Sequence, residues 1–420
     1  MRTYLNRLFD DIIDFSLKSC GAILVVGPKW CGKTRTCRRY AKEVIDLLDI
    51  EKQEQYITFA KNAPSKFLKS YEKPLLIDEW QIISFIWNAI KKEVDDSGDF
   101  GQFILTGSVT DRTTFNDLEN KEIHTGNGRI VKKMMRTFSL FESNESSGEI
   151  SLNDLLQNKK IYAVSKAKIE DYAFYICRGG WPLSLVSDKD IALAQAENYY
   201  RTLYEEDIFS LKDIKIDRNL TFSEKFFRSY ARNVGTSANE STLINDIGCH
   251  QETFKKLYSA ASRLYILDEL AAWSPNLRSK AAIRTKNTMY FVDPSIAAQA
   301  LGLNPDSLFM DMKTFGFLFE SLAIRDLKIY CESIGAKLYH YRDSYDRECD
   351  AVIVFKNGKF GLVEIKLGDE EVIQKAFKTL DAISKDLINK PKFKMVITKG
   401  EFAYNVDEDK YIVPLACLKP

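Results

Sequence analysis

One eight-residue stretch, Gly27-Pro-Lys-Trp-Cys-Gly-Lys-Thr34, constrains the fold of this chain more than any other feature. It fits the pattern G-x-x-x-x-G-K-[ST] without a mismatch, and its two glycines let the backbone turn tightly, so that successive N–H groups can point at phosphate oxygens. The apolar run 22–26 before it predicts a buried strand, and residues 35–48 after it predict a helix. The stretch therefore predicts a phosphate-binding P-loop rather than a chance glycine turn.

A later segment, Pro74-Leu-Leu-Ile-Asp-Glu-Trp80, is an apolar run that ends in two adjacent carboxylates. Downstream of a P-loop, Asp78 is expected to hold Mg²⁺ through water, and Glu79 to orient or deprotonate an attacking water. Lys33 is expected to reach the β- and γ-phosphates, and Thr34 to offer its hydroxyl to Mg²⁺. Without the P-loop upstream, the two carboxylates would indicate only a solvated turn.

A third apolar run, Phe103-Ile-Leu-Thr-Gly-Ser108, ends in hydroxyl groups. A polar sensor of the γ-phosphate would sit at this place, and Thr106 and Ser108 are the candidates. The alternative is a turn that uses serine and glycine for its geometry.

Composition limits the remaining classes. At 420 residues the chain is expected to form two to three domains. Sixty basic and 59 acidic residues leave a net charge of +1, so any nucleic-acid surface must be local. The eight cysteines form no C-x-x-C pair and only three histidines occur, which argues for free thiols and against zinc. No apolar run approaches the roughly eighteen residues of a membrane span, and the start of the chain has no signal-peptide pattern, so a cytoplasmic protein is expected.

Five segments carry a further signal. They are Gly27-Pro-Lys-Trp-Cys-Gly-Lys-Thr34, Leu76-Ile-Asp-Glu-Trp-Gln81, Phe103-Ile-Leu-Thr-Gly-Ser108, His124-Thr-Gly-Asn-Gly-Arg129 and Arg178-Gly-Gly-Trp-Pro182. Together they resemble the bacterial and archaeal AAA-type ATPases that carry a C-terminal domain of unknown function. The resemblance covers the whole chain. It implies a doubly wound P-loop core followed by a small helical lid, with ATP rather than GTP as the nucleotide.

By the same resemblance, Arg129 or Arg178 would contact phosphate, either from the lid or from a neighbouring subunit of a homo-oligomer. A guanidinium group can also meet phosphate in a bidentate manner whatever the family, and the alternative is an ordinary surface arginine. The expected catalytic residues are Glu79, Lys33 and Arg129. The expected nucleotide-binding residues are Gly27, Pro28, Lys29, Cys31, Gly32, Lys33, Thr34, Arg35, Asp78, Thr106, Ser108 and Arg178, with Thr34 and Asp78 holding Mg²⁺.

The middle of the chain predicts helices and a basic wing. Residues 187–217 are helical in pattern and rich in tyrosine and acid, as expected for a lid. Residues 241–256 have the spacing of a helix-turn-helix, with strands expected over 265–273 and 288–293. Between those strands lie four basic residues: Arg278, Lys280, Arg284 and Lys286. A winged helix of this kind suggests contact with double-stranded DNA, although such units also serve as protein interfaces.

The C-terminal part restarts after a linker near Asn304. Its predicted hairpin, 348–355 and 360–367, carries Asp350, Glu364 and Lys366, the D…E-x-K arrangement of restriction-type nucleases. In that arrangement two carboxylates hold Mg²⁺ and the lysine steadies the attacking water, and Glu320 on the preceding helix could add a third oxygen. The family resemblance supports a nuclease-like fold here. The alternative is a charged edge strand that only discourages aggregation.

The loop of this hairpin tests the metal-site prediction. A two-residue turn at Asn357-Gly358 would place Asp350 and Glu364 on opposite faces, because side chains alternate along a strand. A three-residue loop, Lys356-Asn-Gly358, with Gly358 in the left-handed conformation, would place them side by side. We predict the three-residue loop.

The predicted fold is therefore α/β, in four parts: an AAA-type P-loop core with a parallel sheet (1–165), a helical lid (166–217), a winged-helix-like segment (218–303) and a restriction-endonuclease-like domain (304–420). The first functional hypothesis is an ATP-driven switch or motor coupled to a DNA-handling end domain. The second is a Mg²⁺-dependent nuclease that ATP regulates. The third is a partner-binding protein that binds ATP and hydrolyses it negligibly.

Overall fold

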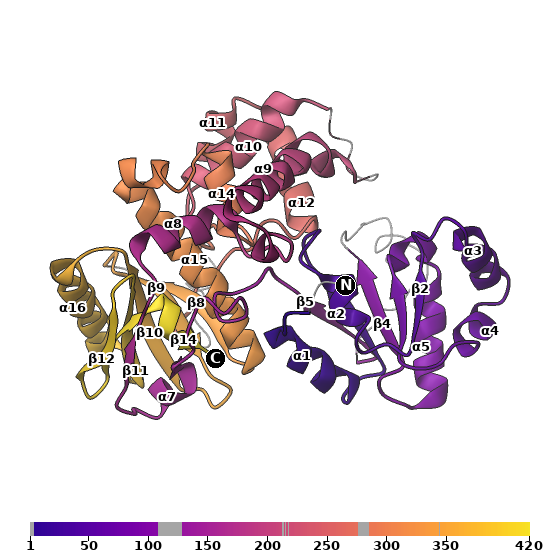
Figure 1. Cartoon of the computed structure of the whole chain (residues 1–420), viewed down its shortest axis with the longest axis horizontal. Helices are drawn as coiled ribbons and strands as arrows, with labels where there is room; N and C mark the ends of the chain where they lie inside the picture. The colour runs from indigo at the N-terminus through magenta and orange to yellow at the C-terminus, as the bar shows by residue number, and fades with distance from the viewer. Residues whose placement is uncertain are drawn as a thin grey trace.

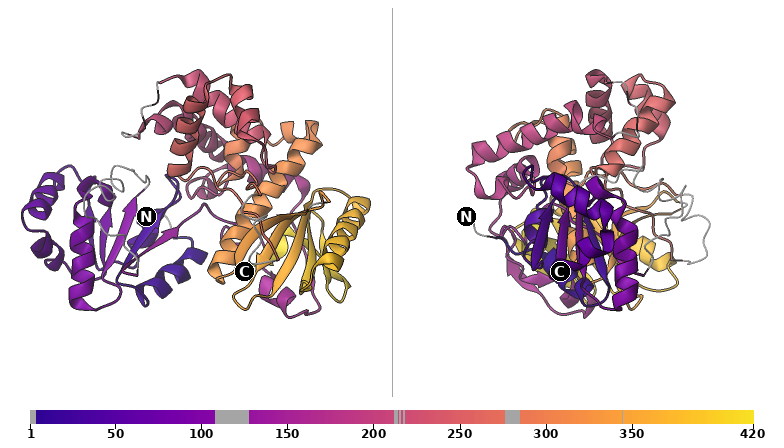
Figure 2. Two further views of the ribbon diagram at one scale, coloured as in Figure 1. Left: turned by 180° about the vertical axis from the view of Figure 1, so that it is seen from behind. Right: turned by 90° about the vertical axis from the view of Figure 1, so that its right-hand side faces the viewer.

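The computed structural model describes residues 4–107, 128–211, 214, 216, 218–275, 285–343 and 345–420. Five residues named from the sequence lie outside these ranges: Ser108, His124, Arg278, Lys280 and Arg284. Figure 1 shows the P-loop part at one side, in indigo and purple, and a C-terminal sheet at the other. Seen from behind in Figure 2, a helical unit lies above both.

The P-loop part is built on a five-stranded parallel sheet in the order β2-β3-β4-β1-β5. Its strands are β1 (Ala22–Val26), β2 (Glu43–Asp46), β3 (Leu75–Asp78), β4 (Phe103–Gly107) and β5 (Ile130–Met134). Strands β1, β3 and β4 are buried along their whole length, as expected for parallel strands covered on both faces. The parallel-sheet core predicted from the sequence is therefore confirmed.

Alternation along β1 divides the helices between the two faces. Ile23 and Val25 pack with residues of α1 (Leu8–Leu17). On the other face, Ala22, Leu24 and Val26 pack with α3 (Gln53–Asn62), α4 (Pro64–Lys69) and α5 (Ile86–Ser97). The helix predicted over 35–48 is wrong: α2 spans only Lys33–Cys37, and residues 43–46 instead form the outer strand β2, whose ladder with β3 outweighs local helix preference.

The predicted lid and winged-helix-like segment share one core. The helical unit consists of α8 (Ile169–Arg178), α9 (Lys189–Glu205), α10 (Leu220–Arg232), α11 (Glu240–Ile247), α12 (Gln251–Arg263) and α14 (Pro294–Ala300). Helix α14 packs against α8, α9 and α10, which joins the parts that the sequence prediction separated at residue 217.

Helices α11 and α12 occur where the helix-turn-helix spacing predicts them, and Gly248 between them is left-handed at φ 71°. The two wing strands, however, are reduced among the described residues to the isolated bridges Leu267–Phe291 and Leu270–Thr288. Beyond them, Ala272 pairs with His340 of the C-terminal sheet. A winged helix therefore stays a prediction.

The C-terminal sheet has seven strands in the order β7-β12-β13-β11-β10-β9-β8. They are β7 (Tyr162–Val164), β8 (Lys337–Arg342), β9 (Glu348–Val354), β10 (Phe360–Lys366), β11 (Phe393–Thr398), β12 (Phe402–Asp407) and β13 (Lys410–Pro414). Helix α15 (Met312–Ser333) shares one core with residues such as Val363, and α16 (Glu370–Asp386) shares another with residues such as Leu362. Alternation along β10 thus gives each face of the sheet its own helix.

The boundary predicted at residue 165 does not follow the structure. Strand β7 pairs antiparallel with β12 at the edge of the C-terminal sheet. Strand β6 (Ile150–Ser151) pairs with β14 (Leu418–Lys419), and α7 (Leu152–Leu156) follows β6 directly. Residues 162–164 therefore belong to the C-terminal sheet, and residues 150–151 form a separate two-stranded sheet with β14, so both pair with residues from 402–419 rather than with the P-loop part.

The β9–β10 hairpin has the predicted three-residue loop. Phe355 and Lys359 close it through a hydrogen bond, the Gly358 N–H donates to the Phe355 carbonyl, and Gly358 is left-handed at φ 78°. The register pairs Ala351 with Val363, so the next pair inward is Asp350 with Glu364. Within the part of the chain that the structure describes, no helix combines the length and apolar character that crossing a bilayer requires.

Candidate nucleotide-binding site

The P-loop leaves β1 through a backbone that only glycine suits. Gly27 has φ 152°, and a Cβ there would lie 2.1 Å from the carbonyl oxygen of Met135. Gly32, at φ 99°, ends the loop at the start of α2. Across the loop, the Lys33 Nζ donates to the carbonyl oxygens of Gly27 at 2.9 Å and Pro28 at 2.8 Å. The ammonium group therefore lies inside the loop, where its partners among the described residues are neutral.

Two hydroxyl groups meet one carboxylate oxygen at the carboxyl end of the sheet. Thr34 donates to Asp78 Oδ1 at 3.0 Å, and Thr106 donates to the same oxygen. Strands β3 and β4 are neighbours in register, with Asp78 opposite Thr106, so the sheet itself brings these two residues together. The structure thus unites three residues that the sequence predicted for one site. Their oxygens form a donor set that suits a hard cation such as Mg²⁺.

Glu79, the predicted base, follows Asp78 in the left-handed conformation at φ 55° and ψ 43°. Only a few per cent of residues other than glycine have positive φ, and such strain gathers at functional sites. Burial raises the pKa of Glu79 above its usual range, and a 2.5 Å hydrogen bond from Gln81 Nε2 to Glu79 Oε2 opposes that rise. Sequence reasoning quoted Gln81 but gave it no role.

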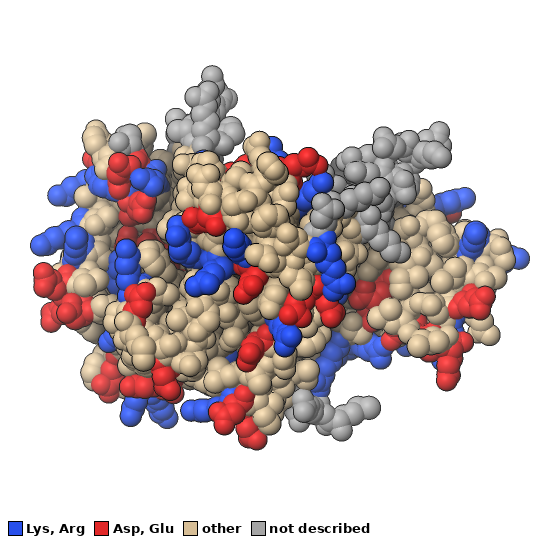
Figure 3. Space-filling view, turned by 90° about the horizontal axis from the view of Figure 1, so that it is seen from above, with Lys and Arg blue, Asp and Glu red and all other residues tan. Residues whose placement is uncertain are grey.

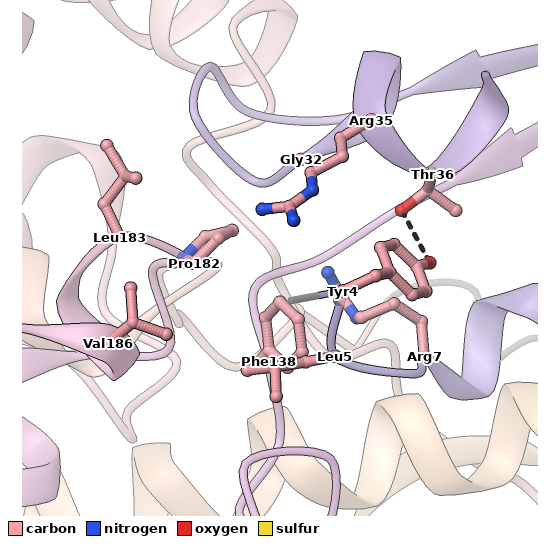
Figure 4. Close-up of a pocket in the computed structure, with 10 residues that line it drawn as sticks. All are labelled: Tyr4, Leu5, Arg7, Gly32, Arg35, Thr36, Phe138, Pro182, Leu183 and Val186. Atoms are coloured by element: carbon pink, nitrogen blue, oxygen red, sulfur yellow. Dashed lines mark hydrogen bonds between the residues drawn. The ribbon is translucent and has the colours of Figure 1, made fainter. Parts of the chain in front are cut away.

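A pocket opens beside the P-loop (Figure 4). The residues that line it are Tyr4, Leu5, Arg7, Gly32, Arg35, Thr36, Phe138, Pro182, Leu183 and Val186. Figure 4 shows the Arg35 side chain directed into the space between the loop and the segment that carries Pro182 and Leu183. Of the lining residues, the sequence predicted Gly32 and Arg35 for nucleotide binding. Of the others, Thr36 follows Arg35 directly and Pro182 belongs to the Gly-Gly-Trp-Pro pattern, while the rest lie far from the P-loop in the chain and were not predicted for this site.

Arg7 fixes the floor of this pocket. Its Nε lies 3.1 Å from Glu142 Oε1, and its Nη1 donates to the carbonyl oxygen of Cys31 within the P-loop. The guanidinium also lies over the Phe138 ring at 3.8 Å. Arg7 thus joins the start of the chain to the P-loop through Cys31 and to the segment after β5 through Glu142. The Arg7–Glu142 ion pair is almost fully buried.

The helical unit contacts the P-loop directly. Lys29 Nζ lies 2.6 Å from Asp207 Oδ1, and the Trp30 ring lies 5.6 Å from Tyr199. The turn after α8 explains the Gly-Gly-Trp-Pro pattern: a Cβ on Gly180 would lie 2.2 Å from the Phe138 carbonyl oxygen, and Pro182 lies against Gly32. Three P-loop residues, Lys29, Trp30 and Gly32, therefore contact the helical unit or the turn that follows α8.

The two predicted phosphate-binding arginines lie elsewhere within this chain. Arg129 precedes β5, and its carbonyl oxygen accepts from Ala22, so it lies at the amino end of the sheet, opposite the P-loop. Its side chain pairs with Asp95. Arg178 is buried and forms a bidentate pair with Glu145 at 2.5 and 2.8 Å. The prediction that Arg178 contacts phosphate from the lid disagrees with this pairing, and Arg129 could act only from another subunit.

The second predicted site lies at the β9–β10 hairpin. Lys366 Nζ lies 2.9 Å from Asp350 Oδ2 and 2.6 Å from Glu364 Oε2. Glu320 on α15 accepts a 2.5 Å hydrogen bond from the Tyr290 hydroxyl. The hairpin register therefore brings the D…E-x-K residues together as predicted. Nevertheless, within the described ranges no group of three or more His, Cys, Asp or Glu residues is arranged to hold a metal ion.

On the face shown in Figure 3, basic and acidic side chains of the described residues are interspersed, in keeping with the near-zero net charge. This face offers no broad single-sign surface among those residues.

Three protein families match successive parts of the chain. Residues 20–144 match a family described as AAA domain. Residues 169–307 match one described as Domain of unknown function (DUF8612), and residues 315–418 match Domain of unknown function (DUF4143). The first match covers the P-loop sheet, the second covers the helical unit, and the third covers α15 with most of the C-terminal sheet.

None of the curated proteins matches the chain. Among solved structures, the Walker-type ATPase PABY2304 of Pyrococcus abyssi is 13% identical over 71% of this chain and 96% of that one, with a TM-score of 0.42. Protein VC1899 from Vibrio cholerae is 12% identical over 90% of this chain and 88% of that one, with a TM-score of 0.17. Both TM-scores are below 0.5, so neither structure establishes the fold of this chain. Residues 20–144 are thus similar to an AAA domain and contain an assembled P-loop, and two later parts of the chain match domains of unknown function.

Proposed function

We propose that this chain hydrolyses ATP with Mg²⁺ and transmits its nucleotide state to the helical unit and the C-terminal sheet. The observation that carries the proposal is the single Asp78 oxygen that accepts from both Thr34 and Thr106, beside Lys33 and Glu79. Residues from two strands and the P-loop are organised there around one carboxylate. A solvated turn would have no reason to bury Asp78 and Thr106, which are 5% and 1% exposed.

The residues present fit a nucleotide with its cation. Thr34 and Asp78 would hold Mg²⁺, which when bound neutralises charge on the β- and γ-phosphates. Lys33 would exchange its two carbonyl partners for phosphate oxygens. Glu79 would take a proton from the water whose oxygen attacks the γ-phosphorus, while the bond to the bridging oxygen breaks and ADP leaves.

The test is phosphate release from ATP with Mg²⁺, together with the ATP dissociation constant. Lys33→Ala should abolish turnover and weaken binding. Glu79→Gln should lower turnover by about 10² to 10⁴-fold and keep binding. Lys159→Ala, which removes an exposed lysine that pairs with Asp154 far from the P-loop, is the control. ATP binding without any turnover by the intact protein would favour the partner-binding hypothesis instead.

A second function, Mg²⁺-dependent DNA cleavage, is supported by one observation: the hairpin register that brings Asp350 beside Glu364 and Lys366. Nicking of supercoiled DNA with Mg²⁺ or Mn²⁺ tests it. Cleavage should disappear in Asp350→Asn and persist in Lys33→Ala if ATP only regulates access. Cleavage that survives Asp350→Asn would remove the nuclease hypothesis, and stimulation of ATP turnover by double-stranded DNA would support the switch or motor.

A further inference from the structure

Gln81 joins the end of β3 to the end of β4. Its amide Nε2 donates to Glu79 Oε2 at 2.5 Å. Its other end packs on the last residue of β4, since a Cβ added to Gly107 would lie only 2.6 Å from Gln81 Oε1. The residue before Gly107 is Thr106, which donates to Asp78. The Gln81 amide therefore lies between the predicted base and the strand that carries the predicted sensor.

The carbonyl oxygen of this amide has no hydrogen-bond partner. Gln81 Oε1 is one of the few buried side-chain polar atoms of the described residues that are left unsatisfied. An unmade hydrogen bond of this kind costs about 1–3 kcal/mol, so a structural role alone gives no reason to retain it. The orientation is fixed, because exchanging the amide ends would turn the oxygen toward the Glu79 carboxylate. The oxygen therefore stays buried against Gly107 so that the Nε2 donor can face Glu79.

We propose that Gln81 is a positioning residue for ATP hydrolysis: its N–H fixes the Glu79 carboxylate in the orientation that takes a proton from the attacking water. The inference rests on the proposed function and deepens it. With one proton of the water directed to the fixed carboxylate, a lone pair of the water oxygen is left for the γ-phosphorus. The left-handed conformation of Glu79 would then serve to bring its carboxylate and the Gln81 amide to one side.

The experiment measures kcat and KM for ATP in the wild type, Gln81→Met and Gln53→Met. Gln53 is the matched control, because its amide also donates to an oxygen at this edge of the sheet, the Leu47 carbonyl oxygen, and not to Glu79. Gln81→Met should lower kcat about 10-fold to 100-fold and leave KM within about twofold. Gln53→Met should leave both kcat and KM as in the wild type.

Gly107→Ala provides a second variant if Gln81→Met does not fold. Its added methyl displaces the Gln81 amide without removing it, so kcat should fall by a smaller amount at an unchanged KM. A folded Gln81→Met with kcat within twofold of the wild type would overturn this inference alone. A wild type with no Lys33-dependent turnover would overturn the proposed function as well.

Discussion

Two clusters in this chain combine a lysine with carboxylates, and their internal pairing differs. At the P-loop, among the described residues, Lys33 Nζ donates to two carbonyl oxygens and the Asp78 carboxylate accepts from two hydroxyl groups. At the β9–β10 hairpin, Lys366 Nζ lies within 3 Å of both Asp350 and Glu364. In the first cluster the opposite charges remain separate and can each take a charged ligand. In the second they neutralise each other.

Burial deepens this difference. It raises the pKa of Glu364 well above its usual range and that of Glu320 to about 8, and in both cases the Asp350 charge adds to the rise. Burial alone would lower the pKa of Lys366, but the charges of Asp350 and Glu364 raise it instead. The ammonium group lies within hydrogen-bond distance of the two carboxylates that the nuclease hypothesis assigns to a divalent cation. The two clusters contain the same types of residue and differ in how these pair. Within the described part of the chain, Lys33 is not paired with a carboxylate and can bind phosphate, whereas Lys366 is already paired with Asp350 and Glu364.

Removing the lysine of the hairpin cluster should have the largest effect. Lys366→Ala leaves two adjacent carboxylates without a cation, and breaking a buried pair costs about 3–5 kcal/mol. Since the Lys366 side chain is 29% exposed, we expect a loss of about 2 kcal/mol in the free energy of unfolding at pH 8. Urea unfolding measures it. A loss below about 0.5 kcal/mol would contradict the comparison.

Divalent cations sharpen the same experiment. If the cluster is a latent metal site, Mg²⁺ or Mn²⁺ should restore stability to Lys366→Ala and leave the wild type unchanged. Lys394 is the matched control, because it also lies between two carboxylates, 2.8 Å from Asp381 and 3.0 Å from Asp409, in the neighbouring strand. Equal rescue of Lys394→Ala would indicate general charge screening.

A pH-dependent effect of intermediate size should come from Glu320. Its folded-state pKa of about 8 lies above the usual 4.5, so the folded protein binds this proton more tightly than the unfolded chain does. This contribution to stability is complete below pH 4.5 and is lost as the pH rises through 8, at a slope of at most about 1.4 kcal/mol per pH unit.

The variant Glu320→Gln removes that titration. It should match the wild type near pH 5 and exceed it in melting temperature near pH 9. Tyr290→Phe should move the loss to still higher pH, because the Tyr290 hydroxyl favours the ionised carboxylate. Parallel melting-temperature curves for the wild type and Glu320→Gln would show that Glu320 is ionised throughout.

Local patterns predicted the contents of both clusters. Three sequence patterns predicted the P-loop cluster: the P-loop spacing, the carboxylate pair at 78–79 and the hydroxyl group of Thr106. Each follows an apolar run, and the parallel sheet brings the ends of these strands together. The three-residue hairpin loop followed from side-chain alternation and one glycine. What failed depends on long-range pairing: residues 43–46 became a strand through β3, and 162–164 joined the C-terminal sheet through β12. Arg178 has a partner, Glu145, that its own neighbourhood does not reveal.

The smallest expected effect tests the open character of the P-loop cluster. Lys29 reaches Asp207 of the helical unit, but its side chain is 38% exposed, so the pair should contribute at most about 1 kcal/mol to stability. Nucleotide phosphates would compete with Asp207 for this ammonium group. Asp207→Asn should therefore tighten ATP binding, and Lys29→Ala should weaken it, each by less than about fivefold.

The two variants are expected to change the ATP dissociation constant in opposite directions. A merely structural contact would instead make both variants weaken binding. Titration of a fluorescent ATP analogue measures the two dissociation constants. Lys159→Ala is the control, since Lys159 forms a similar pair with Asp154 far from the P-loop, at 2.7 Å. If Asp207→Asn and Lys29→Ala both weaken binding, the link between Lys29 and the helical unit supports the loop instead of competing with the nucleotide. The Lys29 charge at the P-loop would then be paired within the protein, as the Lys366 charge at the hairpin is.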